Sequence, residues 1–117
     1  MFTGPHYCLV TSEKLLRQEL KKLGVKFHTL NESSEKSDAT CYELVSKRGN
    51  TVFIVYLKKW KGEDPIEVAA LLVHEATHIK QHVIRLMGEH NTGNEFEAYM
   101  MQNIAGNLMQ CFKEQAK

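Results

Sequence analysis

Apolar positions along the chain follow a helical period, then a strand period, and then a helical period again. Leucines recur at helical spacing between residues 15 and 23, which predicts a first amphipathic helix. Thr11 and Ser12 stand where a hydroxyl can cap the start of that helix, and Gly24 stands where a helix commonly ends. The N-terminal part of the chain is therefore expected to contain one short helix that ends at Gly24.

Two β-rich runs come next, after a polar stretch at residues 31–38 that predicts an exposed loop. Residues 40–47 and 51–58 are rich in β-branched and aromatic side chains, and the Arg-Gly-Asn between them predicts a turn. The two runs should therefore form a hairpin. Because residues 51–58 are apolar at successive positions, this strand should be covered on both faces.

A long helix and a last helix complete the pattern. Asp64 can cap the long helix, Pro65 suits its first position and Glu67 suits a capping box, so the helix should run to Gly88. A short polar loop, residues 89–94, then precedes a last helix through Phe112. The order predicts an α+β fold with an N-terminal helix, a small antiparallel sheet and two further helices.

Composition narrows the class of protein. A chain of 117 residues is expected to form one domain, residues 1–117, and its formal charge of +1 argues against a general nucleic-acid or anionic-membrane binder. The three cysteines Cys8, Cys41 and Cys111 are odd in number and outside any CxxC pair, so free thiols in a reducing compartment are expected. With no signal-peptide order near Met1 and no apolar run of about 20 residues, we expect a cytoplasmic protein without a membrane partner.

The long helix carries the pattern His-Glu-x-x-His, read here as HEATH from His74 to His78. Residues four apart lie on one helical face, so the imidazoles of His74 and His78 can reach the same ion. Glu75 can then accept a proton from water held by that ion. Zinc suits such a site because it binds nitrogen and oxygen ligands and lowers the pKa of bound water to about 7.

A third ligand must come from elsewhere in the chain. His82 continues the row of histidines, but it lies about 6 Å farther along the helix than His78, so we expect a solvated surface position for it. The remaining candidates follow the long helix: Glu89, His90, Glu95 and Glu97.

The combination of HEATH with the later GNEFEAYMMQNI resembles the gluzincins, the zinc peptidases in which a glutamate is the third ligand. Thermolysin-like and aminopeptidase-type enzymes share this arrangement, and the small size is most similar to the minimal metallopeptidases of bacteriophages and prophages. The similarity covers about residues 65–110. It implies a minimal zincin-like domain that hydrolyses a peptide or protein substrate, in the host cytosol if the chain is encoded by a phage.

The resemblance leaves both Glu95 and Glu97 as candidates for the third zinc ligand. In the Asn-Glu-x-x-Ala form, the ligand is followed three positions later by a small residue that lets two helices pack closely. Glu95 has Ala98 there, whereas Glu97 has the bulky Met100. Against this, the aminopeptidase type has eighteen residues between the second histidine and the glutamate, which fits Glu97, while Glu95 leaves sixteen. We favour Glu95, because loop lengths vary more readily than helix packing.

Both glutamates also have a purely structural interpretation. If Asn94 caps the last helix, Glu97 is its capping-box residue, and if Thr92 does, Glu95 is. Tyr99 lies one turn after Glu95 and could donate a hydrogen bond to a developing oxyanion, although a helical tyrosine is more often a packing residue. The resemblance further implies that residues 51–58 line the cleft and pair with an extended substrate.

Two rival functions remain open. A SprT-like, nucleic-acid-associated protease would use His90 as third ligand, and the near-neutral charge speaks against it. A non-catalytic phage interaction module would keep zinc only for stability. Glu75 argues for the enzyme, because a structural zinc site needs no general base. Oligomeric state and cleavage preference are not encoded in any pattern that we find.

Overall fold

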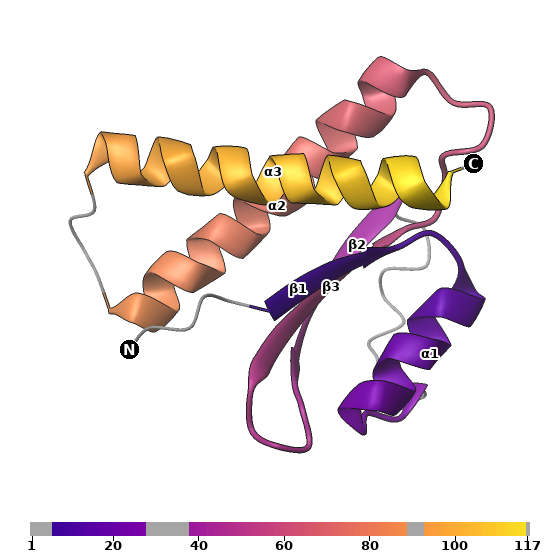
Figure 1. Ribbon diagram of the computed structural model, residues 1–117, viewed down its shortest axis with the longest axis horizontal. Helices are drawn as coiled ribbons and strands as arrows, with labels where there is room; N and C mark the ends of the chain where they lie inside the picture. Colours follow the sequence, from indigo (N-terminus) through magenta and orange to yellow (C-terminus); the bar gives the residue numbers. More distant parts are fainter. Residues whose placement is uncertain (1–5, 28–37, 89–92, 117) are drawn as a thin grey trace.

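A computed structural model describes residues 6–27, 38–88 and 93–116, which form three helices and a three-stranded mixed sheet. Figure 1 shows their arrangement. The elements in chain order are β1 (His6–Val10), α1 (Glu13–Leu23), β2 (Ala39–Val45), β3 (Thr51–Leu57), α2 (Pro65–Met87) and α3 (Asn94–Gln115). The expected loops at 31–38 and 89–94 lie largely outside the described residues, as do Glu89 and His90. The α+β class is confirmed.

The sheet has the order β1-β3-β2, with β1 parallel and β2 antiparallel to β3. The expected hairpin is confirmed, but the prediction of an antiparallel sheet is wrong, because His6–Val10 forms an additional parallel strand. Five residues beside Pro5 carry little periodicity, and their partner lies more than forty positions away in the sequence. Parallel strands are not joined by a hairpin turn, so the sequence carries no turn signal that would predict this pairing.

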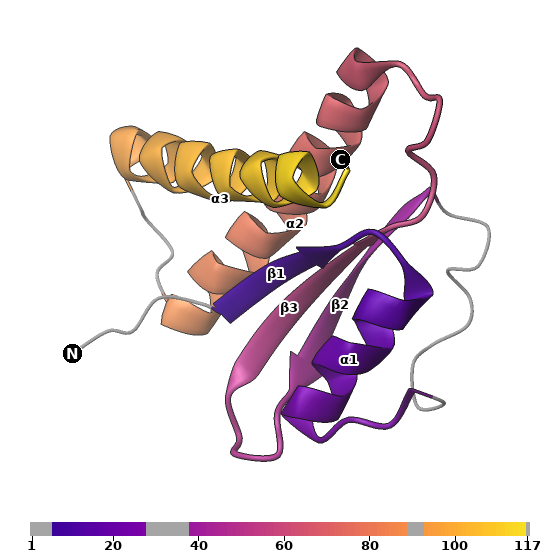
Figure 2. The same cartoon turned by 45° about the vertical axis from the view of Figure 1, so that its right-hand side comes forward.

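Strand β3 lies in the middle of the sheet and is covered on both faces, as the sequence predicts. Phe53, Val55 and Leu57 belong to the core under α2 and α3, whereas Val52 and Ile54 belong to the core under α1. Figure 2 shows α1 on one side of the sheet and the other two helices on the opposite side. Because both edges of β3 are paired, the expectation that residues 51–58 pair with a substrate is wrong.

The first two helices begin and end where their caps predict. The Ser12 hydroxyl accepts a hydrogen bond from the Leu15 amide at 3.2 Å, and the Asp64 carboxylate accepts one from the Ile66 amide at 2.8 Å. Gly24 and Gly88 end α1 and α2 with φ of 76° and 70°. Such left-handed backbone favours glycine, which has no Cβ to clash.

Helix α3 begins at Asn94, and its N-cap is Gly93, which makes no side-chain capping bond. Asn94 is therefore not the cap, so the capping-box interpretation of Glu97 is wrong. Thr92, on which the corresponding interpretation of Glu95 depends, lies outside the described residues. The helix continues three residues past the predicted end at Phe112, to Gln115. This extra turn is anchored to β1, because the Gln115 amide donates to the Leu9 carbonyl oxygen at 2.7 Å. No helix in the described part of the chain is long and apolar enough to cross a membrane.

All three cysteines, which lie within the described ranges, are free thiols, as expected. Burial raises the pKa of Cys8 to about 11, and nearby Glu19 adds to the shift. Burial also raises the pKa of Cys41 to about 12, with the carboxylates of Glu75 and Glu43 contributing.

These values predict slow alkylation of the folded protein. At pH 8 the reactive thiolate would be roughly one molecule in a thousand for Cys8 and one in ten thousand for Cys41. Iodoacetamide should therefore label these two cysteines far more slowly in the native protein than in denaturant, as followed by mass spectrometry. Equal rates in the two states would contradict the burial of both thiols.

Candidate metal centre

His74 and His78 project from adjacent turns of α2 toward the same point. Their Nε2 atoms lie 3.1 Å apart, and the two rings meet edge to face with centroids 4.7 Å apart. Both side chains are exposed. The helix positions them in this way because residues four apart are neighbours on its surface.

The separation of the two nitrogens fits one shared metal ion. Zinc lies about 2.0–2.1 Å from a histidine nitrogen, so two nitrogens on one ion must be less than about 4.2 Å apart. The observed 3.1 Å satisfies this limit. Without an ion, the pair can share one hydrogen bond, in which one ring donates and the other accepts.

Glu75 is the one buried charged residue among those described, with 5% of its surface exposed. It lies on the sheet-facing side of α2, next to Cys41 of β2. The negative charge of Glu75 contributes to the raised pKa of the Cys41 thiol. Burial raises the pKa of the Glu75 carboxyl, and the two neighbouring histidines partly offset that rise. A carboxylate disfavoured by burial holds a proton more readily than an exposed one, as a general base requires.

A polar hollow of about 310 Å³ surrounds these side chains. It lies between α2 and the edge strand β2, and its lining consists of Ala39, Thr40, Cys41, His74, Glu75, His78 and His82. The Thr40 hydroxyl oxygen is buried there without a hydrogen-bond partner, the one such side-chain atom in the described part of the chain. An orphaned buried hydroxyl can bond to a molecule that enters the hollow.

His82 belongs to this hollow, so the prediction of a solvated surface position is wrong. Its Nδ1 lies 3.2 Å from a carboxylate oxygen of Glu43, and its ring packs against Phe53 at a centroid distance of 5.6 Å. Both partners come from strands that lie beside α2. Cys41 and Glu43 are two residues apart in β2 and therefore lie on the same face of the strand. This spacing can be read from the sequence, but it does not indicate which helix packs against that face.

Glu97 faces α2, but on a different side of that helix from the histidines. Its carboxylate lies 3.7 Å from the Lys80 amine, and both side chains are partly buried. Lys80 is two residues from His78, which corresponds to about 200° around a helix. The Glu97 carboxylate is therefore paired with a residue of α2 that lies nearly opposite His78 on that helix.

Glu95 lies on α3 two residues before Glu97 and is exposed. Ala98 is exposed as well, so it is not at the interface between the helices, and the packing reason for choosing Glu95 fails. Tyr99 is 64% exposed and does not line the hollow. Within the described ranges, no three His, Cys, Asp or Glu side chains gather into a metal-binding group. The structure thus brings His74, Glu75 and His78 together, without Glu95, Glu97 or Tyr99.

Comparisons of the sequence with models of protein families and with curated proteins, and of the structure with solved structures, find no match. The paired imidazoles of His74 and His78 beside the buried Glu75 carboxylate are the features of this chain that point to a function.

Proposed function

We propose that this protein is a small zinc-dependent metallopeptidase with a minimal zincin-like domain. The observation that carries the proposal is the 3.1 Å approach of the His74 and His78 Nε2 atoms beside the buried carboxylate of Glu75. The two histidines would hold the zinc ion, and Glu95 would be the third ligand. The three free thiols favour a reducing compartment, and we propose the cytoplasm.

Glu75 is the proposed general base. Its carboxylate accepts a proton from the water that attacks the peptide carbonyl carbon, and it then donates this proton to the leaving amine. A bound zinc ion would make that water more acidic and polarise the substrate carbonyl. The sheet and α2 hold Glu75 in place, since its neighbours Ala76 and Ile79 are fully buried in the core.

Strand β2 is the proposed docking edge for substrate, in place of the central strand β3. It lines the hollow and, among the described residues, is paired on one side only, so its other edge is available for hydrogen bonds to an extended peptide. A second hollow of about 420 Å³ adjoins the first at His74 and could receive a substrate side chain. Its lining combines apolar and charged residues: Asp38, Lys59, Glu63, Glu67, Val68, Ala70, Leu71 and His74.

Metal binding by three histidine variants tests the proposal. We expect the wild-type protein to bind one zinc ion per chain, and His74→Gln and His78→Gln each to lose it, because each change removes one nitrogen of the close pair. His82→Gln is the matched control, since it alters the same residue type one turn farther along α2. Zinc content after dialysis against a weak chelator gives the answer. Retention of zinc in all three variants would overturn the proposal.

The third ligand is tested by two alanine variants. Glu97 is held by Lys80, whereas Glu95 has no ion-pair partner among the described residues and is the freer carboxylate. We expect Glu95→Ala to weaken zinc binding strongly, because a catalytic zinc site normally has three protein ligands. Glu97→Ala should keep the metal and lose about 0.2–1 kcal/mol of stability with its ion pair.

Competition for zinc against a fluorescent chelator measures both affinities. If Glu97→Ala loses the metal and Glu95→Ala keeps it, the eighteen-residue spacing was the better guide. If neither variant changes affinity, the third ligand lies elsewhere in the chain. His90, the ligand expected of a SprT-like protease, would then be replaced by glutamine in the same assay.

A further inference from the structure

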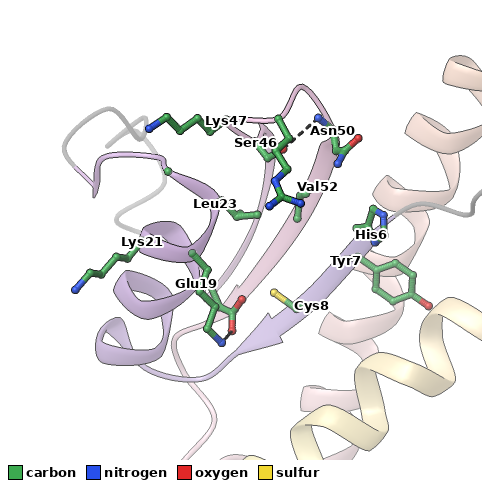
Figure 3. Close-up of a pocket in the computed structure, with 13 residues that line it drawn as sticks. His6, Tyr7, Cys8, Glu19, Lys21, Leu23, Ser46, Lys47, Asn50 and Val52 are labelled. Carbon is green, nitrogen blue, oxygen red and sulfur yellow. Dashed lines mark hydrogen bonds and ion pairs between the residues drawn. The ribbon is translucent and has the colours of Figure 1, made fainter.

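A hollow larger than the two at the candidate metal centre lies on the other side of the sheet. It has a volume of about 650 Å³ and lies between the last turns of α1, the tip of the β2–β3 hairpin and the start of β1. Figure 3 shows this region, with Cys8, Leu23 and Val52 inside it and Lys21 and Lys47 extending from its rim. It shares no lining residue with either hollow at the metal centre.

Positive charge dominates the lining. Four cationic side chains, Lys21, Lys22, Lys47 and Arg48, stand against one carboxylate, that of Glu19. Glu19 is already engaged, because its oxygen lies 3.3 Å from the Lys22 amine. No carboxylate in the described part of the chain forms an ion pair with Lys21, Lys47 or Arg48. This local excess contrasts with the net charge of +1 for the whole chain.

The backbone joins the two segments that carry these cations. The Lys47 amide donates to the Leu23 carbonyl oxygen at 2.9 Å, which joins the hairpin to the end of α1. The Lys47 side chain packs so closely over Gly24 that a Cβ there would lie 3.0 Å from the Lys47 Cβ. Lys21 and Lys22 lie in the last turn of α1, where positive charge interacts favourably with the helix dipole. Lys47 and Arg48 belong to the hairpin, so the helix dipole does not explain their position. Grouped like charges repel one another, and an anion relieves that repulsion.

The interior of the hollow is mainly apolar, and the Glu19 carboxylate, which pairs with Lys22, lies beside Cys8. Leu23 and Val52 contribute hydrocarbon, and the Cys8 side chain points into the space from β1 (Figure 3). Burial raises the pKa of the Cys8 thiol to about 11, so it carries no negative charge at neutral pH that would oppose an anion. The side chain of the neighbouring Tyr7 lies on the opposite side of the sheet, where its hydroxyl accepts a hydrogen bond from Asn107 of α3 at 2.7 Å.

We propose that this hollow binds a small anion that carries at least two phosphate groups, with the phosphates at the cationic rim. Three cations that have no ion-pair partner among the described residues, on two joined segments, match a multiply charged group better than a single carboxylate. The volume lies within the range of small-ligand sites, about 300–1,000 Å³. The apolar interior favours a ligand with a flat or apolar portion, such as a nucleoside diphosphate, and inorganic pyrophosphate shares the same anionic chemistry.

Calorimetric titration with ADP and with pyrophosphate, at low ionic strength and without divalent metal, tests the site. We expect both to bind the wild type, ADP more tightly because its base and ribose can use the interior. The double variant Lys47→Gln/Arg48→Gln should bind at least tenfold more weakly. Glutamine keeps the Lys47 carbons that pack over Gly24, so the fold should be retained. The matched control Arg85→Gln/Lys113→Gln removes one arginine and one lysine from the ends of α2 and α3 and should bind like the wild type.

Several results would overturn the proposal. Equal weakening in both double variants would show only nonspecific attraction to net charge. No binding of either ligand to the wild type would exclude the site. Binding of a single-stranded oligonucleotide with no binding of ADP or pyrophosphate would assign the surface to nucleic acid instead. Pyrophosphate binding as tightly as ADP would contradict the role given to the apolar interior.

Discussion

Replacement of Glu75 by glutamine is expected to lower kcat/KM for peptide hydrolysis by roughly 10²–10⁴-fold while zinc stays bound. The amide has nearly the same shape as the carboxylate and fits the same buried position, but it does not accept the proton of the attacking water. Glu75 is not a proposed zinc ligand, so metal content should equal that of the wild type. Hydrolysis of a fluorogenic peptide library and zinc analysis on the same preparation make the measurement.

One matched control variant and two contrary outcomes complete this test. Glu114→Gln makes the same chemical change on the exposed side of α3 and should leave activity unchanged. Full activity of Glu75→Gln would show that HEATH is not the catalytic motif, and loss of zinc would show that the roles are misassigned.

The pH dependence of stability gives a third readout on the metal-free protein. Burial raises the pKa of folded Glu75 above the ordinary value of 4.5, so its stabilising contribution is full below that pH and is lost as pH rises through the folded pKa. Metal-free Glu75→Gln should therefore be more stable than metal-free wild type at neutral pH. The difference should disappear in acid.

Replacement of Phe53 by alanine is expected to cost about 3–5 kcal/mol of unfolding free energy. Phe53 is fully buried at the middle of the central strand and belongs to the core shared with α2. Removing the ring leaves a cavity whose surroundings, a paired strand and a packed helix, relax only in part. Urea unfolding followed by circular dichroism measures the change.

Phe96→Ala is the matched control for this substitution. Phe96 lies in the first turn of α3 with 46% of its surface exposed, so the same change in side chain should cost only about 0.5 kcal/mol. Similar losses at the two positions would contradict the assignment of the core to the sheet and its covering helices.

The sequence by itself determined the features that depend on neighbours along the chain. The ends of α1 and α2 follow from Ser12, Asp64 and two glycines, because capping involves groups within a few residues of each other. The close approach of His74 and His78 follows from helical geometry alone. The hairpin and the burial of β3 on both faces likewise follow from a local turn and an uninterrupted apolar run.

Only the tertiary structure decided what these elements meet. The parallel pairing of β1, the contact of His82 with Glu43 and the ion pair of Glu97 with Lys80 each join residues distant in sequence. The sequence pattern shows that α3 is a helix, but its rotation against α2 depends on packing with both α2 and β1. For this reason the exposure of Ala98, on which the choice of Glu95 depended, was not predictable. Secondary structure is encoded locally, whereas side-chain partners are chosen by non-local packing that a single helical period does not specify.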